Sequence, residues 1–216
     1  IRAKANIAEC YIYLKQPDSA LAILEPLYRK AKQEHFYRLS GSMAILMGRI
    51  YADKKMPDKA LPLVQEALQD AKTTGMPDSE AEALMYLGIL NKKNNEATAL
   101  QNFKDATALA DKYQLHMIGW EAWFELGEFY YEKNNHAEAI IAYKHSVTLI
   151  DKNSANIYGG EDARKTYQSS GKKPELYARL ISSLSATGAT EEAWAFAQKT
   201  QQEAIKDLLG NLHADA

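Results

Sequence analysis

Histidine and cysteine are the residue types in this sequence most able to do chemistry, as bases, nucleophiles or metal ligands. The single cysteine, Cys10, has no histidine beside it in the sequence, so we expect an inert, packed thiol. The five histidines never pair with cysteine or acidic residues at metal-ligand spacing. His136 and Glu138 come closest, but residues two apart on a helix do not share a face. We therefore expect no catalytic site, no metal site and no cofactor.

Composition and charge exclude other classes of site. Gly159 and Gly160 lack the pattern of a phosphate-binding loop and follow no expected strand. The net charge of -2 does not favour nucleic-acid binding, which needs a basic stripe. No apolar run approaches the length of about 18 residues that crosses a membrane. The chain starts at Ile1 in the register of a helix and without methionine, which we interpret as a fragment or processed form. We expect a cytoplasmic protein.

The strongest pattern is an internal repeat of helical stripes. Apolar residues recur at spacings of three and four, stop at a short polar break and then resume, which is typical of two consecutive helices. Small residues mark the same place in each helix pair and advance by about 40 residues, a period that indicates a repeat architecture. The first helices carry the column Ala8, Gly48, Gly88 and Gly127, and the second helices carry the column Ala20, Ala60, Ala99 and Ala139.

The breaks define the expected organisation. Residues 1–150 should form four helix pairs, residues 151–173 an insertion with a short helix, and residues 174–216 a fifth pair and a C-terminal helix, all in one continuous domain. Proline suits the first turn of a helix, and Asn suits the tight turns. The helix-starting prolines are Pro17, Pro57, Pro77 and Pro174, and the turn residues are Asn94, Asn95, Asn134 and Asn135. Pro26 lies inside a helical stretch, where we expect a kink or an early end.

These helix pairs resemble the tetratricopeptide repeat. Trp123, Leu126, Gly127 and Tyr130 match the first-helix pattern of that family, and other pairs match most of it. The sequence departs from the family at Asn91 and Ile181, which replace its Tyr and Gly, and it lacks the closing Pro. A period near 40 is similar to the long-repeat branch found in bacterial regulators and kinesin light chains. The resemblance implies an all-α, right-handed superhelical solenoid of antiparallel helix pairs.

A narrower resemblance concerns the C-terminal part. Ala193, Trp194 and the stretch 201–210 resemble the segment that leads into the caspase-like (CHAT) peptidase domain of bacterial repeat–peptidase fusions. The resemblance implies that a catalytic domain would follow Ala216.

The solenoid would place its binding residues on the first helices. Stacked pairs form a concave groove lined by first-helix residues that point away from the packed stripe. By helical spacing these are Ala5, Glu9 and Tyr13; Ile45 and Arg49; Met85 and Ile89; Phe124, Glu128 and Tyr131. Exposed apolar residues here would dock an amphipathic helix or an extended peptide. The alternative is that they are buried against a neighbouring domain or the chain's own terminal helix.

The residue types in the groove also indicate which class of partner it could bind. Repeat proteins that clamp acidic chaperone tails use Lys and Asn to pair the terminal carboxylate. Ile45, Met85 and Phe124 take the corresponding places here, which argues against such a tail. The leading function is a protein- or peptide-binding scaffold, the non-catalytic repeat region of a larger regulatory protein. The alternative is the sensing arm of a caspase-like peptidase, or of a DNA-binding regulator, whose output domain is absent from this chain.

Overall fold

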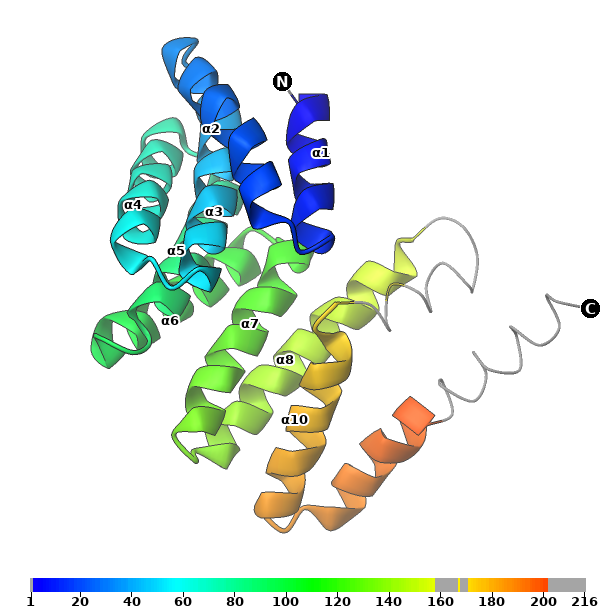
Figure 1. The fold of residues 1–216 in the computed structure, drawn as a ribbon. Coiled ribbons are helices and arrows are strands. Elements are labelled where there is room, and N and C mark those ends of the chain that lie inside the picture. The colour runs from blue at the N-terminus through cyan, green and yellow to red at the C-terminus, as the bar shows by residue number, and fades with distance from the viewer. Residues whose placement is uncertain (1, 158–166, 168–170, 202–216) are drawn as a thin grey trace, which may run out of the picture. The chain divides into compact units, whose positions relative to one another are not determined.

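The chain folds into helices joined by short turns (Figure 1). The computed structural model describes residues 2–157, 167 and 171–201, and no strand occurs among them. The helices are α1 (Arg2–Tyr13), α2 (Pro17–Gln33), α3 (Tyr37–Asp53), α4 (Pro57–Thr74), α5 (Pro77–Asn91), α6 (Glu96–Lys112), α7 (His116–Glu132), α8 (His136–Ala155), α10 (Lys173–Ala186) and a helix over 190–201. The all-α helix-pair architecture expected from the repeat is confirmed.

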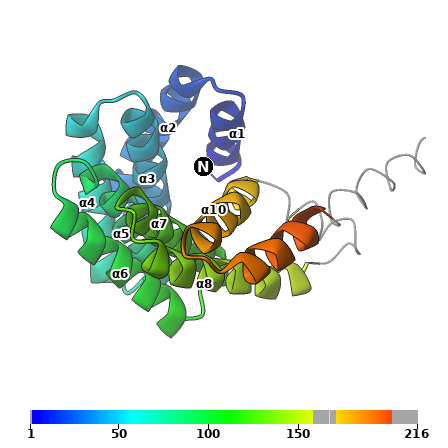
Figure 2. The ribbon, with the colours of Figure 1, turned by 90° about the horizontal axis from the view of Figure 1, so that it is seen from below.

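Two compact units make up the chain, Ile1–Ile118 and Gly119–Ala216. In the first unit each helix from α1 to α5 packs against the next helix along the chain. In the second unit α10 lies against α8 and is followed by helix 190–201 (Figure 2). One continuous domain through both units stays a prediction.

Local sequence explains where several helices begin. Proline occupies the first turn of α2, α4, α5 and α10, as expected, because its missing N–H needs no partner there. The side chain of Asn95 accepts a hydrogen bond from the Thr98 amide at 3.2 Å, and Asn135 accepts one from the Glu138 amide at 3.4 Å. Each asparagine thus caps an amide at the start of its helix. Asn134 has the left-handed backbone predicted for the turn, with φ of 56°.

Two predicted boundaries are wrong. Helix α2 does not end early at Pro26 but continues to Gln33, because buried residues on both sides of the proline, Leu24 and Ala31, hold the helix in place. The kink that was the other expectation for Pro26 stays a prediction. Helix α8 extends past residue 150 to Ala155, where Ser154 is still buried. The expected short helix after Gly159–Gly160 and the C-terminal helix after residue 201 lie outside the described residues.

The small residues of the two columns lie where the two helices of each pair contact each other. Ala8, Ala20, Ala60, Ala99 and Ala139 are each 0% exposed.

Three of the four residues in the first-helix column are glycines for a steric reason. A Cβ on Gly48 would lie 2.5 Å from Val64 Cγ2, and a Cβ on Gly88 would lie 2.5 Å from Phe103 Cε1. Gly127 faces the ring of Tyr143 in the same way. Glycine is therefore present where a large second-helix side chain fills the place of a first-helix Cβ.

We predict that Gly88→Ala lowers the free energy of unfolding by about 1–3 kcal/mol, the usual cost of overpacking. The added Cβ meets the Phe103 ring, which is fully buried. Chemical denaturation followed by circular dichroism measures the change.

The matched control is Gly41→Ala in α3, where an added Cβ meets nothing within 4 Å. Alanine there should be neutral or stabilising by roughly 0.5–1 kcal/mol, as expected for Gly replaced in a helix. Equal stability of the two variants would contradict the steric role of Gly88.

Candidate binding surface

The first helices of the first unit pack directly on one another. Helix α3 contacts both α1 and α5. Ile45 belongs to a buried cluster with Ala83 and Leu87 of α5, and it is 1% exposed. Met85 is 3% exposed. The prediction that Ile45 and Met85 are exposed in a groove is wrong, because side chains between neighbouring first helices fill the space between them.

Three accessible side chains remain at equivalent positions of these helices. Glu9 on α1 and Arg49 on α3 are exposed, and Ile89 on α5 is half-buried. Each directly follows its column residue, so the three occupy the same place on neighbouring helices. We call Glu9, Arg49 and Ile89 the first-helix face. The side chain of Tyr13, also predicted for the groove, lies outside the described residues.

In the second unit, Phe124 is buried as well. It is 2% exposed, its ring lies 6.1 Å from the ring of Tyr143, and Lys172 Nζ lies 5.7 Å from the ring centroid. The exposure predicted for Phe124 is therefore wrong. Here residues of the same unit take the place expected for a ligand.

Glu128 and Tyr131 also contact their own unit. Tyr143 donates a hydrogen bond to Glu128 Oε1 at 2.5 Å, and Arg179 Nε of α10 lies 3.2 Å from the same oxygen. The Arg179 guanidinium stacks 4.6 Å above the Tyr131 ring, and the Tyr131 and Ser182 hydroxyls lie 3.2 Å apart. Side chains of helix α10 therefore contact both of these predicted groove residues.

Charge in this cluster is matched. Burial and the hydrogen bond to Glu128 raise the pKa of Tyr143. Desolvation would lower the pKa of Arg179, but Glu128 and Tyr131 outweigh it and raise that pKa. Tyr143 stays neutral and Arg179 stays charged around neutral pH, so the cluster ties α7, α8 and α10 together. The sequence reasoning did not connect Glu128 to Arg179, 51 residues later, although Glu175, Arg179 and Ser182 share a helical stripe.

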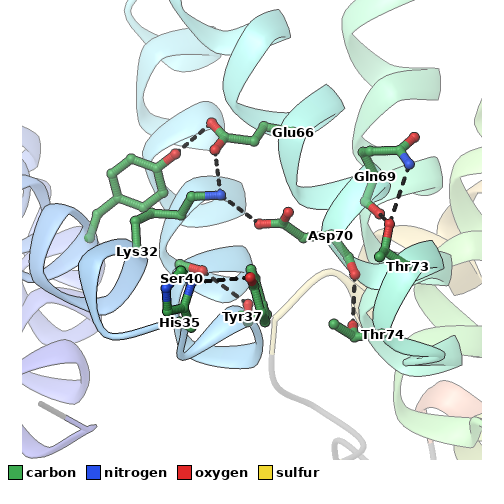
Figure 3. A network of polar contacts seen from close by, with 10 residues as sticks. Lys32, His35, Tyr37, Ser40, Glu66, Gln69, Asp70, Thr73 and Thr74 are labelled. Carbon is green, nitrogen blue, oxygen red and sulfur yellow. Dashed lines mark hydrogen bonds and ion pairs between the residues drawn. The ribbon is translucent and has the colours of Figure 1, made fainter.

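A second polar cluster joins α2 and α4 in the first unit (Figure 3). Tyr28 donates to Glu66 Oε2 at 2.6 Å. Lys32 Nζ lies 2.6 Å from Glu66 Oε1 and 2.9 Å from Asp70 Oδ2. Sequence reasoning missed this cluster. Its signal was a pair of residues four apart, Tyr28 and Lys32, followed 38 residues later by Glu66 and Asp70 at the same spacing.

This cluster is suited to linking helices and not to proton transfer. Burial and Glu66 raise the pKa of Tyr28. For Lys32, hydrogen bonds to Glu66 and Asp70 outweigh desolvation and raise the pKa, while for Glu66, Lys32 and Tyr28 outweigh desolvation and lower it. A useful general acid or base has a pKa near the working pH, and none of these shifts goes in that direction.

Other predicted features can be placed on the described residues. Cys10 is exposed, so the expectation of a packed thiol is wrong, because the described residues leave that side of α1 uncovered. Across the described ranges, no group of three or more His, Cys, Asp or Glu side chains is arranged to hold a metal ion. No described helix combines the length and apolar character needed to cross a membrane.

Comparison with known families bears on the second unit. The tetratricopeptide-repeat family model matches residues 121–153, which hold the Gly127–Tyr143 contact. This stretch matches one tetratricopeptide repeat, and the solved structures below share the fold of the rest of the chain. No curated protein matches the sequence. The resemblance of the C-terminal part to peptidase fusions has no support in these comparisons and stays a prediction.

Solved structures agree on the fold. One is a Podosopora anserina protein described as a kinesin light chain with nearly identical TPR-like repeats, at 15% identity, TM-score 0.63 and 95% coverage of both chains. MamA is similar at 18% identity and TM-score 0.57, covering 94% of this chain and 96% of that one. Aspartyl phosphate phosphatase F of Bacillus subtilis has TM-score 0.62 at 18% identity, covering 93% of this chain and 58% of the phosphatase.

We predict that Tyr143→Phe lowers the free energy of unfolding by about 1–3 kcal/mol, because it removes a donor from a buried carboxylate. Urea denaturation measures the loss. Tyr113→Phe is the matched control, since Tyr113 is 48% exposed, and a change within about 0.5 kcal/mol is usual for surface positions. A Tyr143 variant as stable as this control would contradict the role of the Glu128 hydrogen bond.

The α2–α4 cluster predicts a pH-dependent difference between wild type and Glu66→Gln. Since the folded pKa of Glu66 is lowered, its stabilisation is complete above the unfolded value of about 4.3 and is lost as pH falls through the folded pKa. Since the pKa of Lys32 is raised, its share persists up to about pH 10.4 and is lost above that value. Urea melts at pH 7 and pH 3 should show a stability gap that shrinks at pH 3.

The control for this pH series is Glu34→Gln, at an exposed glutamate at the end of α2. Its stability difference from wild type should be small at both pH values. A Glu66→Gln gap of the same size at pH 3 and pH 7 would count against the ion-pair assignment.

Proposed function

We propose that this chain is a non-catalytic scaffold that binds a protein or peptide segment on the first-helix face, Glu9, Arg49 and Ile89. Stacked helical repeats present extended binding surfaces of this kind. The observation that carries the proposal is the accessibility of these three side chains on three neighbouring helices, next to buried Ile45 and Met85. Of the groove residues predicted from the sequence, the proposed surface keeps only those that are accessible in the first unit.

The side chains suggest the chemistry of the ligand. The planar guanidinium of Arg49 suits a carboxylate, which it can bind through two parallel hydrogen bonds. Ile89 offers apolar surface 40 residues further on, at the equivalent place of the next first helix. Glu9 on the other side favours a basic group. A segment in which an acidic residue lies between a basic and an apolar residue would complement all three.

Burial decides which of the predicted residues support the surface without touching the ligand. Ile45 and Met85 each lie four residues before a member of the first-helix face and hold neighbouring helices together. The role predicted from the sequence, as the repeat region of a larger cytoplasmic regulatory protein, is part of the same proposal. The similarity in fold to phosphatase F of Bacillus subtilis is compatible with that setting.

We predict that peptides selected from a random display library against the intact protein contain an acidic residue next to an apolar one. Binding of a selected peptide, followed by fluorescence anisotropy, should weaken at least about tenfold in Arg49→Glu, because one well-formed charged contact contributes about 1.5–3 kcal/mol.

The matched control is Arg29→Glu, an identical charge reversal at an exposed position of α2, away from the first helices. It should leave the affinity unchanged, and both variants should keep the helical circular dichroism of the wild type. Equal affinity of the two variants for the selected peptides would overturn the assignment of the first-helix face.

A further inference from the structure

Three cations of α10 and its N-cap residue lie over aromatic rings of α7. The cations are those of Lys172, Lys173 and Arg179. In that order, their distances to the facing ring centroid are 5.7, 5.1 and 4.6 Å, and the rings belong to Phe124, Trp120 and Tyr131. The face of an aromatic ring attracts a cation, so each of these contacts favours a basic side chain.

Two of these cations also pair with carboxylates that α7 buries. Lys172 donates to Glu125 Oε1 at 2.5 Å, and Arg179 Nε lies 3.2 Å from Glu128 Oε1. The side chains of Glu125 and Glu128 are only 9% and 11% exposed, whereas those of Lys172 and Arg179 are 51% and 36% exposed. The acids are thus buried parts of α7, and the cations reach them from its edge.

Lys173 extends the same arrangement by one turn of α7. It is buried, and its amine donates to the backbone oxygen of Tyr167 at 2.5 Å. Burial lowers the pKa of Lys173, and the negative charge of Glu121 acts in the opposite direction. Glu121, Glu125 and Glu128 follow one another at spacings of four and three, so they form one stripe of α7. We call this stripe and the three adjoining rings the acidic–aromatic face.

The first unit has apolar residues where the acidic–aromatic face has a carboxylate. Glu125 lies two residues before the column glycine of α7. Leu46 and Tyr86 hold the same place in α3 and α5, and both are partly buried in hydrophobic clusters. Neighbouring first helices of the first unit therefore pack there through apolar side chains, whereas α10 meets α7 through charges.

The charges decide which segment fits the acidic–aromatic face. A buried carboxylate that loses its cation is strongly unfavourable. An apolar or acidic segment in place of α10 would leave Glu125 and Glu128 unpaired, whereas another basic segment would pair both of them again. Ion pairs with a half-exposed partner contribute little stability, so the exchange of one basic segment for another has a small electrostatic cost.

We propose that α10 is an autoinhibitory occupant of the acidic–aromatic face, and that this face binds a basic helix of a partner protein when α10 moves away. The closed arrangement is the resting one, because Leu176 and Leu180 also pack α10 against α8. A partner helix therefore needs an apolar stripe beside its Lys or Arg residues. The proposal is independent of the first-helix face, whose residues lie on α1, α3 and α5.

A labelled peptide with the sequence of residues 171–187 tests the exchange, with fluorescence anisotropy on the intact chain as the measurement. It should bind the wild type weakly, because the attached α10 competes at a high effective concentration. The double variant Lys172→Ala, Arg179→Ala weakens this internal competitor and keeps the acids, so it should bind the peptide at least about tenfold more tightly. Adding Glu125→Gln to the double variant should remove most of that gain.

Matched controls separate this contact from nonspecific charge effects. The double variant Arg29→Ala, Lys30→Ala removes two exposed cations of α2 and should leave the peptide affinity at the wild-type value. A peptide with its three basic residues replaced by glutamine should bind neither chain. Circular dichroism checks the fold, and if the α10 double variant loses helix, Lys172→Ala alone, which keeps the Arg179–Glu128 pair, is measured in its place.

The outcome is separate from that of the first-helix face, because Arg49→Glu should not change the affinity for this peptide. Equal affinity of the peptide for the wild type and for the variant with a weakened α10 contact would overturn the proposal. Binding of the glutamine peptide as tight as that of the basic peptide would overturn it as well.

Discussion

The close approach of two helices at the glycine column is the constraint on which the rest of the structure depends. Val64, Phe103 and Tyr143 fill the places where Cβ atoms of Gly48, Gly88 and Gly127 would stand. Because a large side chain fixes the second helix at this distance, each pair becomes a well-defined block. Neighbouring residues on the first helix then have set directions, either toward the preceding pair or toward the solvent.

In this geometry a buried side chain and an exposed one are only two residues apart on the first helix. Met47 and Leu87, just before the column, are buried against the preceding pair, whereas Arg49, just after it, is exposed. In the second unit the corresponding residue, Glu128, is bound by Arg179 and Tyr143. The same register therefore holds an exposed side chain in one unit and an internal link in the other.

Polar contacts between helices supplement the apolar packing between neighbouring helix pairs. The cluster of Tyr28, Lys32, Glu66 and Asp70 joins equivalent turns of α2 and α4, at separations close to the repeat length. Partly exposed ion pairs contribute little individually. The cluster nevertheless favours one register between the two helices, since Lys32 lies between two carboxylates one turn apart and a slip by one turn would break at least one of these contacts.

The sequence by itself determined the helix pairs, the columns of small residues and the prolines at helix starts, because these depend on local periodicity and backbone chemistry. It also indicated the repeat family. Only the tertiary structure decided that Ile45, Met85 and Phe124 are buried and that α2 continues through Pro26. Helical spacing gives the direction of a side chain, but exposure depends on which other helix lies in that direction. Contacts such as Glu128 with Arg179 join distant residues, and only the packed helices bring them together.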